Sequence, residues 1–531
     1  MPAAELQREE VRNRLLRRVD WRFLLPDPHP ERSVCFASGG LAEAVEAISG
    51  ELLDPVTAGI AGDCDLAVVL DPTSATLREA WAALRPGGSC YAEWHTLPGR
   101  GPAGTRRRLQ AAGFENVVCY GPRPNPARKV ARVWVPLDST AAVRHFVHSG
   151  PSPRSALRRA GRTLRRALWL SHPGARVALP ICAIARKPAL DLAQHAPTND
   201  PAPEGLLDMI RSQWSAWGLG EHPEDLGLLL LTGGQRSINK VVALACASST
   251  DAPQVAVKIS RTPEAATGLA NEARVLAALD DRARGLHIPR LLWCEQRGGL
   301  VRLAETALMG QPLLGKLRED SYRELARRAT DWQIRLAGAA RVQPPRAWRS
   351  RLVEPVLAEF TATYGPVIDS ILLREAERVL DSLGPLPLVC EQRDFAPWNL
   401  LLAPDGELVV LDWESAELEG LPALDLVYFL TYAGFFLDDA FTSHRYEASY
   451  RATLEQATAT GAVARDCLAR YMKAVGVGAE ALHPLRVLCW MLHARSEYAQ
   501  FAGDAGGRPT PEVLRRGVFV RLWEEELRHG A

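Results

Sequence analysis

Two aspartates and one asparagine are spaced so that they could act together on a phosphate group. Asp394 and Asn399 are five residues apart, and Asp412 follows after two apolar runs joined by the turn PDG. Such a turn between alternating apolar runs predicts a β-hairpin, which would bring the three side chains to one end of a ribbon. In phosphoryl transfer one carboxylate takes the proton of the attacking hydroxyl, while an amide and a second carboxylate hold Mg²⁺. A polar hairpin on an ordinary surface, the alternative, explains one acid but not the spaced set.

The segments RDFAPWN and LDWESA, which contain these residues, resemble the catalytic loop and metal-binding segment of the aminoglycoside phosphotransferase and choline kinase family, relatives of the protein kinases. The resemblance implies that Asp394 is the catalytic base and that Asn399 and Asp412 are Mg²⁺ ligands. It also implies that Asp425 is a structural acid. The family usually has His where this chain has Gln392. Glutamine hydrogen-bonds the backbone but cannot ionise, so we expect the loop geometry to be kept.

A glycine-rich turn and a lysine further upstream are typical of a nucleotide site. The run LGLLLLTGGQRSINKVVALACA predicts strand, turn and strand, in which Gly233 and Gly234 let the backbone near Ser237 approach the phosphates. Such hairpins are common, but the next strand, VAVKIS, presents Lys258, one of only six lysines in the chain. A compact ammonium group suits a position between the α and β phosphates.

The resemblance extends to the elements that follow this lysine. Glu272 resembles the helix glutamate that pairs with the lysine, although an exposed helical glutamate would look the same. Backbone groups from Glu305 to Ala307 would contact the nucleotide base, and Gly310 matches the family's pattern after this hinge. The resemblance covers about residues 205–531 and implies an α+β bilobal protein-kinase-like fold that uses ATP and Mg²⁺.

Length and charge indicate more than one folded unit. The chain has 531 residues, 47% of them hydrophobic and 24% charged, as in ordinary globular proteins. Its net charge of +1 hides an asymmetry, because residues 1–190 contain 27 Lys and Arg against 17 Asp and Glu. The remaining residues therefore carry a net charge of −9. This contrast predicts two units with different surfaces.

Residues 30–187 are predicted to form an α/β, doubly wound parallel sheet, since strands alternate with helices. The segments DLAVVLDP, LRPGG and LQAAGFENV resemble a class I S-adenosylmethionine-dependent (SAM-dependent) methyltransferase with a Rossmann-like fold. Only Gly39 and Gly40 remain of a cofactor-binding turn, and Asp54 could be the ribose acid or any solvated aspartate. The roughly 25 residues before the next strand are too few for two further strand and helix pairs. We therefore expect a degenerate unit that does not bind SAM.

Residues 154–168 carry six arginines among leucines and alanines. On a helix they would form a basic face for a membrane surface or an anionic partner, unless the helix is simply a solvated insertion. Nucleic acid is not favoured, because stacking aromatics are absent nearby. Ten scattered cysteines without C-x-x-C spacing favour reduced thiols. Since no apolar run approaches about 18 residues and the N-terminus is not signal-like, a cytoplasmic location is predicted.

The predicted organisation has four parts. They are a degenerate methyltransferase-like α/β domain (1–187), a linker (188–204), a kinase-like N-lobe (205–309) and a helical C-lobe with the acceptor site (310–531). In the C-lobe, Tyr428, Phe429, Trp490 and Tyr498 could line an acceptor pocket or form the helical core. His493 on such a helix is more often packed than catalytic.

The function implied by these patterns is ATP- and Mg²⁺-dependent phosphoryl transfer to a hydroxyl of a small molecule or glycan. The acceptor would be a sugar, an aminoglycoside-like compound or an amino alcohol. Two alternatives stay open. The chain could be a scaffold with both sites silent, or a bifunctional methyltransferase and kinase that caps a polysaccharide.

Overall fold

The computed structural model of the protein describes residues 15–95, 101–149, 170, 180–189, 205–221, 223–233, 240–250, 252–455, 457–505 and 508–529. These residues belong to two compact units. The sheet unit contains Arg8–Leu269 and Leu292–Ala307, and the helical unit contains Ala270–Leu291 and Leu308–Ala531. Among the residues just named as described, no helix is both long and apolar enough to cross a membrane.

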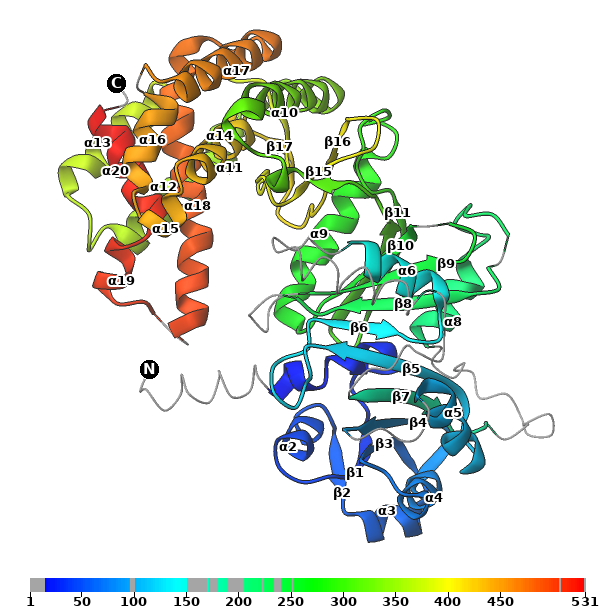
Figure 1. Cartoon of the computed structure of the whole chain (residues 1–531). Coiled ribbons are helices and arrows are strands. Elements are labelled where there is room, and N and C mark those ends of the chain that lie inside the picture. The colour runs from blue at the N-terminus through cyan, green and yellow to red at the C-terminus, as the bar shows by residue number, and fades with distance from the viewer. Residues whose placement is uncertain are drawn as a thin grey trace. The chain divides into compact units, whose positions relative to one another are not determined.

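The described part of the sheet unit contains a twelve-stranded sheet (Figure 1). Its strands are β1 (Arg32–Phe36), β2 (Glu51–Leu53), β3 (Cys64–Leu70), β4 (Leu84–Trp94), β5 (Glu115–Arg123), β6 (Val133–Pro136), β7 (Ile181–Arg186), β8 (Leu226–Leu231), β9 (Val241–Ala247), β10 (Pro253–Ile259), β11 (Leu291–Arg297) and β12 (Leu300–Thr306). Their order is β2-β1-β3-β4-β7-β5-β6-β8-β9-β10-β12-β11. The pairs among β1 to β4 are parallel, and β7 lies antiparallel between β4 and β5.

Helices connect the parallel strands, because a parallel crossover needs a long connection. The helices of this unit with described bounds are the 3-10 helix η1 (Asp20–Leu24), α2 (Gly40–Glu46), α3 (Pro55–Ala61), α4 (Ser74–Ala83), α5 (Gly101–Ala111), α6 (Thr140–Ser149), α8 (Leu206–Gln213) and the first part of α9 (Pro263–Leu279). Strand β3 is fully buried from Leu66 to Val69, as expected for a parallel strand covered on both faces. The predicted alternation of strands and helices is confirmed, whereas the methyltransferase likeness is not.

Two short elements between β1 and β3 are missing from the sequence-based prediction. Strand β2 has three residues and α3 has seven, so the segment holds one short further strand and helix pair, in keeping with the expectation that two would not fit. Asp54 is the N-cap of α3, since its Oδ1 accepts hydrogen bonds from Val56 N and Thr57 N. The Asp54 carboxylate therefore has a structural use. Strand β6 and helix α6 are also missing from the prediction.

Several predictions fall at the limits of the described residues. The basic segment 154–168 lies outside them, and the linker 188–204 is described only for its first two residues. At the N-terminus the described residues begin at residue 15, and residues 15–18 are helical. Between residues 174 and 188 the structure describes residues 180–188, which include strand β7. All ten cysteines are free, as predicted, and eight of them are buried.

The sheet continues from the N-terminal strands into those of the predicted N-lobe. Strand β6 pairs antiparallel with β8, with Trp134 opposite Leu230. One apolar core lies against both sets of strands, and its members include Trp21, Tyr91, Trp134, Leu230, Val257 and Ala304. The strands of residues 1–187 and 205–309 therefore form one compact unit, while the predicted domain limits stay a prediction.

The helical unit contains the predicted catalytic segment. Its helices besides the end of α9 are η3 (Leu313–Gly315), α10 (Glu319–Ala340), α11 (Trp348–Leu352), α12 (Glu354–Tyr364), α13 (Ser370–Asp381), α14 (Leu424–Leu437), α15 (Ala440–Ser443), α16 (Tyr446–Leu454), α17 (Ala459–Val475), η4 (Ala479–Ala481), α18 (Leu482–Ala505), α19 (Pro511–Arg515) and α20 (Val518–His529). Large buried rings fill its core, among them Trp332, Trp413, Trp490 and Trp523. Trp332 packs 5.4 Å from Phe395 and 6.2 Å from Trp413, measured between ring centroids, so the core supports the catalytic segment directly.

Short strands of the helical unit position that segment. They are β13 (Gln311–Pro312), β14 (Val389–Glu391), β15 (Leu400–Leu402), β16 (Leu408–Val410) and β17 (Glu417–Gly420). The predicted hairpin is confirmed, because β15 and β16 pair with Leu400 opposite Val410. Gly406 has a φ of 85°, which explains the glycine of the turn. Strand β13 pairs with β15, and a Cβ at Gly310 would lie 2.7 Å from the Leu401 Cβ, so this position requires glycine.

Candidate active site

Asp394 and Asn399 are in direct contact in the turn that follows β14. The Asn399 Nδ2 donates to the backbone oxygen of Asp394 at 2.9 Å and to the carboxylate Oδ2 at 2.7 Å. The Asn399 N–H donates to Ala396 O at 2.9 Å and tightens the same turn. Because Nδ2 makes both side-chain bonds, the amide oxygen of Asn399 is the atom that can ligate a cation.

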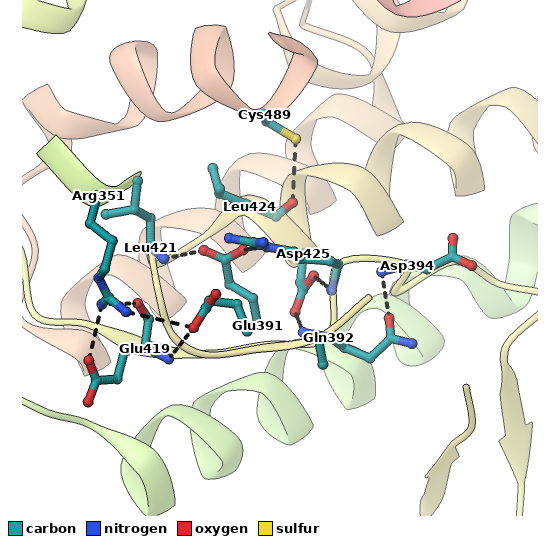
Figure 2. A network of polar contacts seen from close by, with 12 residues as sticks. Arg351, Glu391, Gln392, Asp394, Glu419, Leu421, Leu424, Asp425 and Cys489 are labelled. Atoms are coloured by element: carbon teal, nitrogen blue, oxygen red, sulfur yellow. Dashed lines mark hydrogen bonds and ion pairs between the residues drawn. The ribbon is translucent and has the colours of Figure 1, made fainter. Parts of the chain in front are cut away.

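Gln392 connects this turn to the segment that carries Asp412. Its Oε1 accepts a hydrogen bond from Asp394 N at 2.8 Å (Figure 2). Its Nε2 donates to Leu411 O at 3.1 Å and to Asp412 O at 2.5 Å. The side chain is fully buried and uses both ends of its amide. This bridge needs no charge, which explains how glutamine can replace the histidine that the family usually has.

Asp425, in the first turn of α14, holds the backbone of the same turn. Its carboxylate accepts hydrogen bonds from Gln392 N at 2.6 Å and from Arg393 N at 2.8 Å (Figure 2). Arg393 has a φ of 64° and Asp412 a φ of 67°, a left-handed conformation that costs energy for residues with a Cβ. Asp425 therefore stabilises a strained corner next to Asp394. This is the structural role implied by the resemblance.

The protonation of Asp425 predicts a pH dependence of stability. Burial, with a contribution from the Glu391 carboxylate, raises the pKa of Asp425 from 3.8 to about 7. The folded state thus binds the proton more tightly than the unfolded state, so stability falls as the pH rises from about 4 to 7, by up to about 1.4 kcal/mol per pH unit. We expect Asp425→Asn to flatten this slope in urea unfolding at about pH 5, 6 and 7. Equal slopes for both proteins would contradict the prediction.

The end of α9 holds the backbone that follows Asp412. The Glu272 Oε1 accepts a hydrogen bond from Trp413 N at 2.8 Å, and the Asn271 Nδ2 donates to Glu414 O at 3.1 Å. Glu272 is fully buried, so the alternative of an exposed helical glutamate is wrong. Together with the bond from Gln392, these contacts fix the backbone of the predicted metal-binding segment on both sides of Asp412.

In the sheet unit, Lys258 of β10 forms an ion pair with Glu305 of β12, with 2.9 Å between Nζ and Oε1. The two side chains are only 7% and 3% exposed, so the ammonium is held in place. Beyond Glu305, Ala307 N donates to Gln254 O at 2.9 Å and continues the contact of the two strands. The pairing of Lys258 with Glu272, a residue of the helical unit, stays a prediction.

The predicted phosphate-covering turn is described only at its start. Gly233 follows β8, whereas Gly234 and Ser237 lie outside the described residues. Among the described atoms, none lies within 4 Å of a Cβ built at Gly233. The helical unit thus brings Asp394, Asn399 and the Asp412 backbone together and also contains Glu272, whereas Gly233, Lys258, Glu305 and Ala307 belong to the sheet unit.

Trp398 is a candidate site residue that the sequence interpretation missed. It lies four residues after Asp394 and is 41% exposed. Its ring meets Tyr432 edge to face at 4.9 Å and Phe436 at 6.2 Å between centroids. Phe441, 38% exposed, packs on Phe436 at 4.7 Å. A large aromatic residue between two polar site residues was the signal that could have identified it.

The aromatics considered for an acceptor pocket serve mainly as core. Phe429 and Trp490 are fully buried and Tyr428 is 5% exposed. These three residues thus belong to the helical core, which was the alternative to an acceptor pocket. Tyr498 is partly buried at the edge of the same core. His493 stacks on Tyr428 with 3.8 Å between ring centroids, which fits the packed role expected for it.

Residues 244–463 match the family model APH, the phosphotransferase enzyme family. This part of the chain is therefore an APH phosphotransferase domain, which confirms that part of the resemblance. Solved structures of aminoglycoside phosphotransferases are also similar. A complex of APH(2")-IIIa with GDP and kanamycin is 15% identical, with 60% of this chain and 97% of that chain covered and a TM-score of 0.37.

Two further solved structures show the same level of similarity. A thermostable mutant of APH(4)-Ia with ADP and hygromycin B is 14% identical, with 61% of this chain and 99% of that chain covered and a TM-score of 0.38. ADP-bound APH(2'')-Ib is 12% identical, with 60% and 98% covered and a TM-score of 0.35. No curated protein matches the chain.

Proposed function

We propose that the protein transfers a phosphoryl group from ATP to a hydroxyl group of a small molecule or glycan. The observation that carries the proposal is the contact of Asn399 with Asp394, together with the bridge that Gln392 forms to Asp412. Asp394 orients the acceptor hydroxyl and accepts its proton. The family match of residues 244–463 supports the same reaction class.

The nucleotide is assigned to the residues of the sheet unit. Lys258 contacts the α and β phosphates as a compact positive charge, and Glu305 restrains it. Backbone groups at Glu305 and Ala307 contact the base. Gly233 allows the chain to approach the phosphates closely, together with Gly234 and Ser237.

Asn399 and Asp412 fit Mg²⁺ by the chemistry of their donor atoms. Mg²⁺ prefers hard oxygen ligands, and the Asn399 amide oxygen and the Asp412 carboxylate supply them. Asp394, Asn399 and Asp412 are all partly exposed, whereas the supporting acids Glu272 and Asp425 are buried. When bound, the ion would neutralise charge on the nucleotide phosphates. The partly exposed side chains thus include both of those assigned as Mg²⁺ ligands.

The exposed aromatic face at Trp398 is assigned to the acceptor. Tyr432 and Phe436 pack against the indole ring and hold it in place, and aromatic rings bind both apolar faces and organic cations. A ring carried four residues after Asp394 in the same segment is assigned to hold an acceptor while its hydroxyl reaches the base. This placement fits a sugar, an aminoglycoside-like compound or an amino alcohol.

Trp398→Ala should raise the KM for the acceptor about tenfold and leave the KM for ATP unchanged. The reason is that the ring is half exposed, so its loss removes acceptor contacts and little of the core. Steady-state kinetics with one substrate varied at a time measures both values. A proportional rise of both KM values would contradict the assignment.

Mg²⁺-dependent release of ADP from ATP, or of GDP from GTP, by the full-length protein tests the proposed reaction. The acceptor panel contains sugars, aminoglycosides, amino alcohols and oligosaccharides, and the mass of a phosphorylated product identifies the class. Acceptor-stimulated release supports the proposal. No release, together with no thermal shift by Mg-ATP, would reject it and favour the scaffold.

We also infer that residues 30–187 keep a methyltransferase-like fold without methyl transfer. Strands β2 and β3 lie on opposite sides of β1, which is a doubly wound arrangement. Only Gly39 and Gly40 follow β1 at the point where the strand order reverses, and Asp54 is engaged as a helix cap. Isothermal titration with SAM should give no binding. Tight binding would instead favour the bifunctional alternative.

A further inference from the structure

Thr232, the residue before the predicted phosphate-covering turn, is held by four hydrogen bonds. Its N–H donates to Arg132 O at 2.8 Å, and its Oγ1 donates to Ala131 O at 2.7 Å. Its carbonyl oxygen accepts bonds from Arg17 Nη2 at 3.1 Å and from Arg261 Nη2 at 3.4 Å. Thr232 is fully buried. Three of its four partners belong to the first 187 residues, so the N-terminal part of the chain fixes its position.

The two arginines that reach Thr232 belong to a buried ionic cluster. Asp20 is fully buried and accepts two bonds from Arg261, one from Nε and one from Nη2, both at 3.0 Å. Arg22, also fully buried, donates to the backbone oxygen of Arg261 at 3.2 Å. Within the described residues this aspartate thus lies among three buried arginines, since Arg17 is only 7% exposed. Burial of such charges has a high desolvation cost. The cluster is therefore better explained by a role in fixing the local geometry than by a gain in folding stability.

The cluster contacts both elements assigned to the phosphates. Thr232 leads directly into Gly233, and Arg261 lies three residues after Lys258, just beyond the end of β10. A hydrogen bond between Arg261 and Thr232 therefore connects the end of the lysine strand to the start of the turn. Arg17 donates to the same carbonyl oxygen from a segment outside the family match.

We propose that Arg17 is a positioning residue for nucleotide binding, which acts by holding Thr232 and with it Gly233, the described residue at the start of the predicted phosphate-covering turn. The inference rests on the proposed function, because only that function assigns the turn to the phosphates. A displacement of Gly233 by about 1 Å would weaken the contact with the phosphates that is assigned to it. The N-terminal part of the chain thus contributes to nucleotide affinity although it need not touch the nucleotide.

Arg17→Met in the full-length protein tests this role. Methionine keeps a long apolar side chain and removes the donor to Thr232. We expect the Kd for Mg-ATP to rise about tenfold, measured by isothermal titration at a temperature where circular dichroism shows the variant folded. In turnover, the KM for ATP should rise more than kcat falls. Arg17→Lys, which keeps a cationic donor, should recover most of the affinity.

Arg18→Met is the matched control, because Arg18 is the next residue but pairs with Glu93 at 2.8 Å. It should lower the Tm without changing the Kd for Mg-ATP. An unchanged Kd in Arg17→Met overturns the inference, and so does an equal rise in both variants, because affinity would then follow stability. If the wild type binds no Mg-ATP, the proposed function fails and this inference with it. If both wild type and Arg17→Met bind equally, only the inference fails.

Discussion

Asp394→Asn should lower kcat for phosphoryl transfer by about 10²–10⁴-fold, the contribution typical of a general base. The amide cannot accept the proton of the attacking hydroxyl. Its oxygen can still accept the bond from Asn399 Nδ2, which is 2.7 Å long in the native protein, so the fold should be kept. ADP release at saturating Mg-ATP and acceptor measures the effect, with the Tm as the check on folding.

Asp405→Asn is the matched control for this substitution. Asp405 is exposed in the turn of the same hairpin and accepts a hydrogen bond from Glu407 N at 3.0 Å. Asparagine makes this type of bond equally well, so the control should keep kcat within about twofold of the wild type. An Asp394→Asn variant as active as this control would exclude Asp394 as the base.

Gln392→Leu should lower the free energy of unfolding by about 2–5 kcal/mol and kcat by about tenfold to a hundredfold. Leucine has a similar size but leaves Asp394 N, Leu411 O and Asp412 O without the bonds that Gln392 makes, and buried unpaired groups cost about 1–3 kcal/mol each. The turn and the segment assigned to Mg²⁺ would then no longer be held together, and misplacement of about 1 Å is enough to slow catalysis strongly. Urea unfolding and ADP release measure the two effects.

Gln392→His replaces glutamine but keeps part of its hydrogen bonds, so it tests whether these bonds or the glutamine side chain as such is required. A neutral imidazole offers one donor and one acceptor, so it can keep the bond from Asp394 N and one of the two bonds to the backbone oxygens. We expect this variant to lose less stability and less activity than Gln392→Leu. If Gln392→Leu and the wild type have the same midpoint of urea unfolding, the hydrogen bonds of Gln392 do not stabilise the fold.

The hairpin and its polar residues could be predicted because the signal is local. Alternating apolar residues and the glycine of the turn, Gly406, specify β15 and β16 within a dozen positions of the chain. Asp394, Asn399 and Asp412 then lie at the ends of these short elements. Local spacing also singled out Lys258 as a candidate, because a single lysine on an alternating strand is conspicuous in a chain that contains far more arginine than lysine.

The contacts that support the site could not be predicted, because their partners are far apart in the chain. Glu272 accepts a bond from Trp413 N, 141 residues later, and Arg261 reaches Asp20 over 241 residues. No periodicity marks such pairs. The pairing of β6 with β8 is hidden for another reason, since a strand of four residues has too little pattern to distinguish it from a loop.

The pairing of β6 with β8 also determines which strands of the sheet have an unpaired edge. Unpaired strand edges promote association between chains, and short or charged edge strands limit it. The edges of this sheet are β2, which has three residues, and β11, which ends in the charged Glu295 and Arg297. The apolar strands β8 to β10 are interior and already paired on both sides. The N-terminal strands thus cover an edge of β8 that would otherwise be open to association with other chains, and this role requires no catalysis.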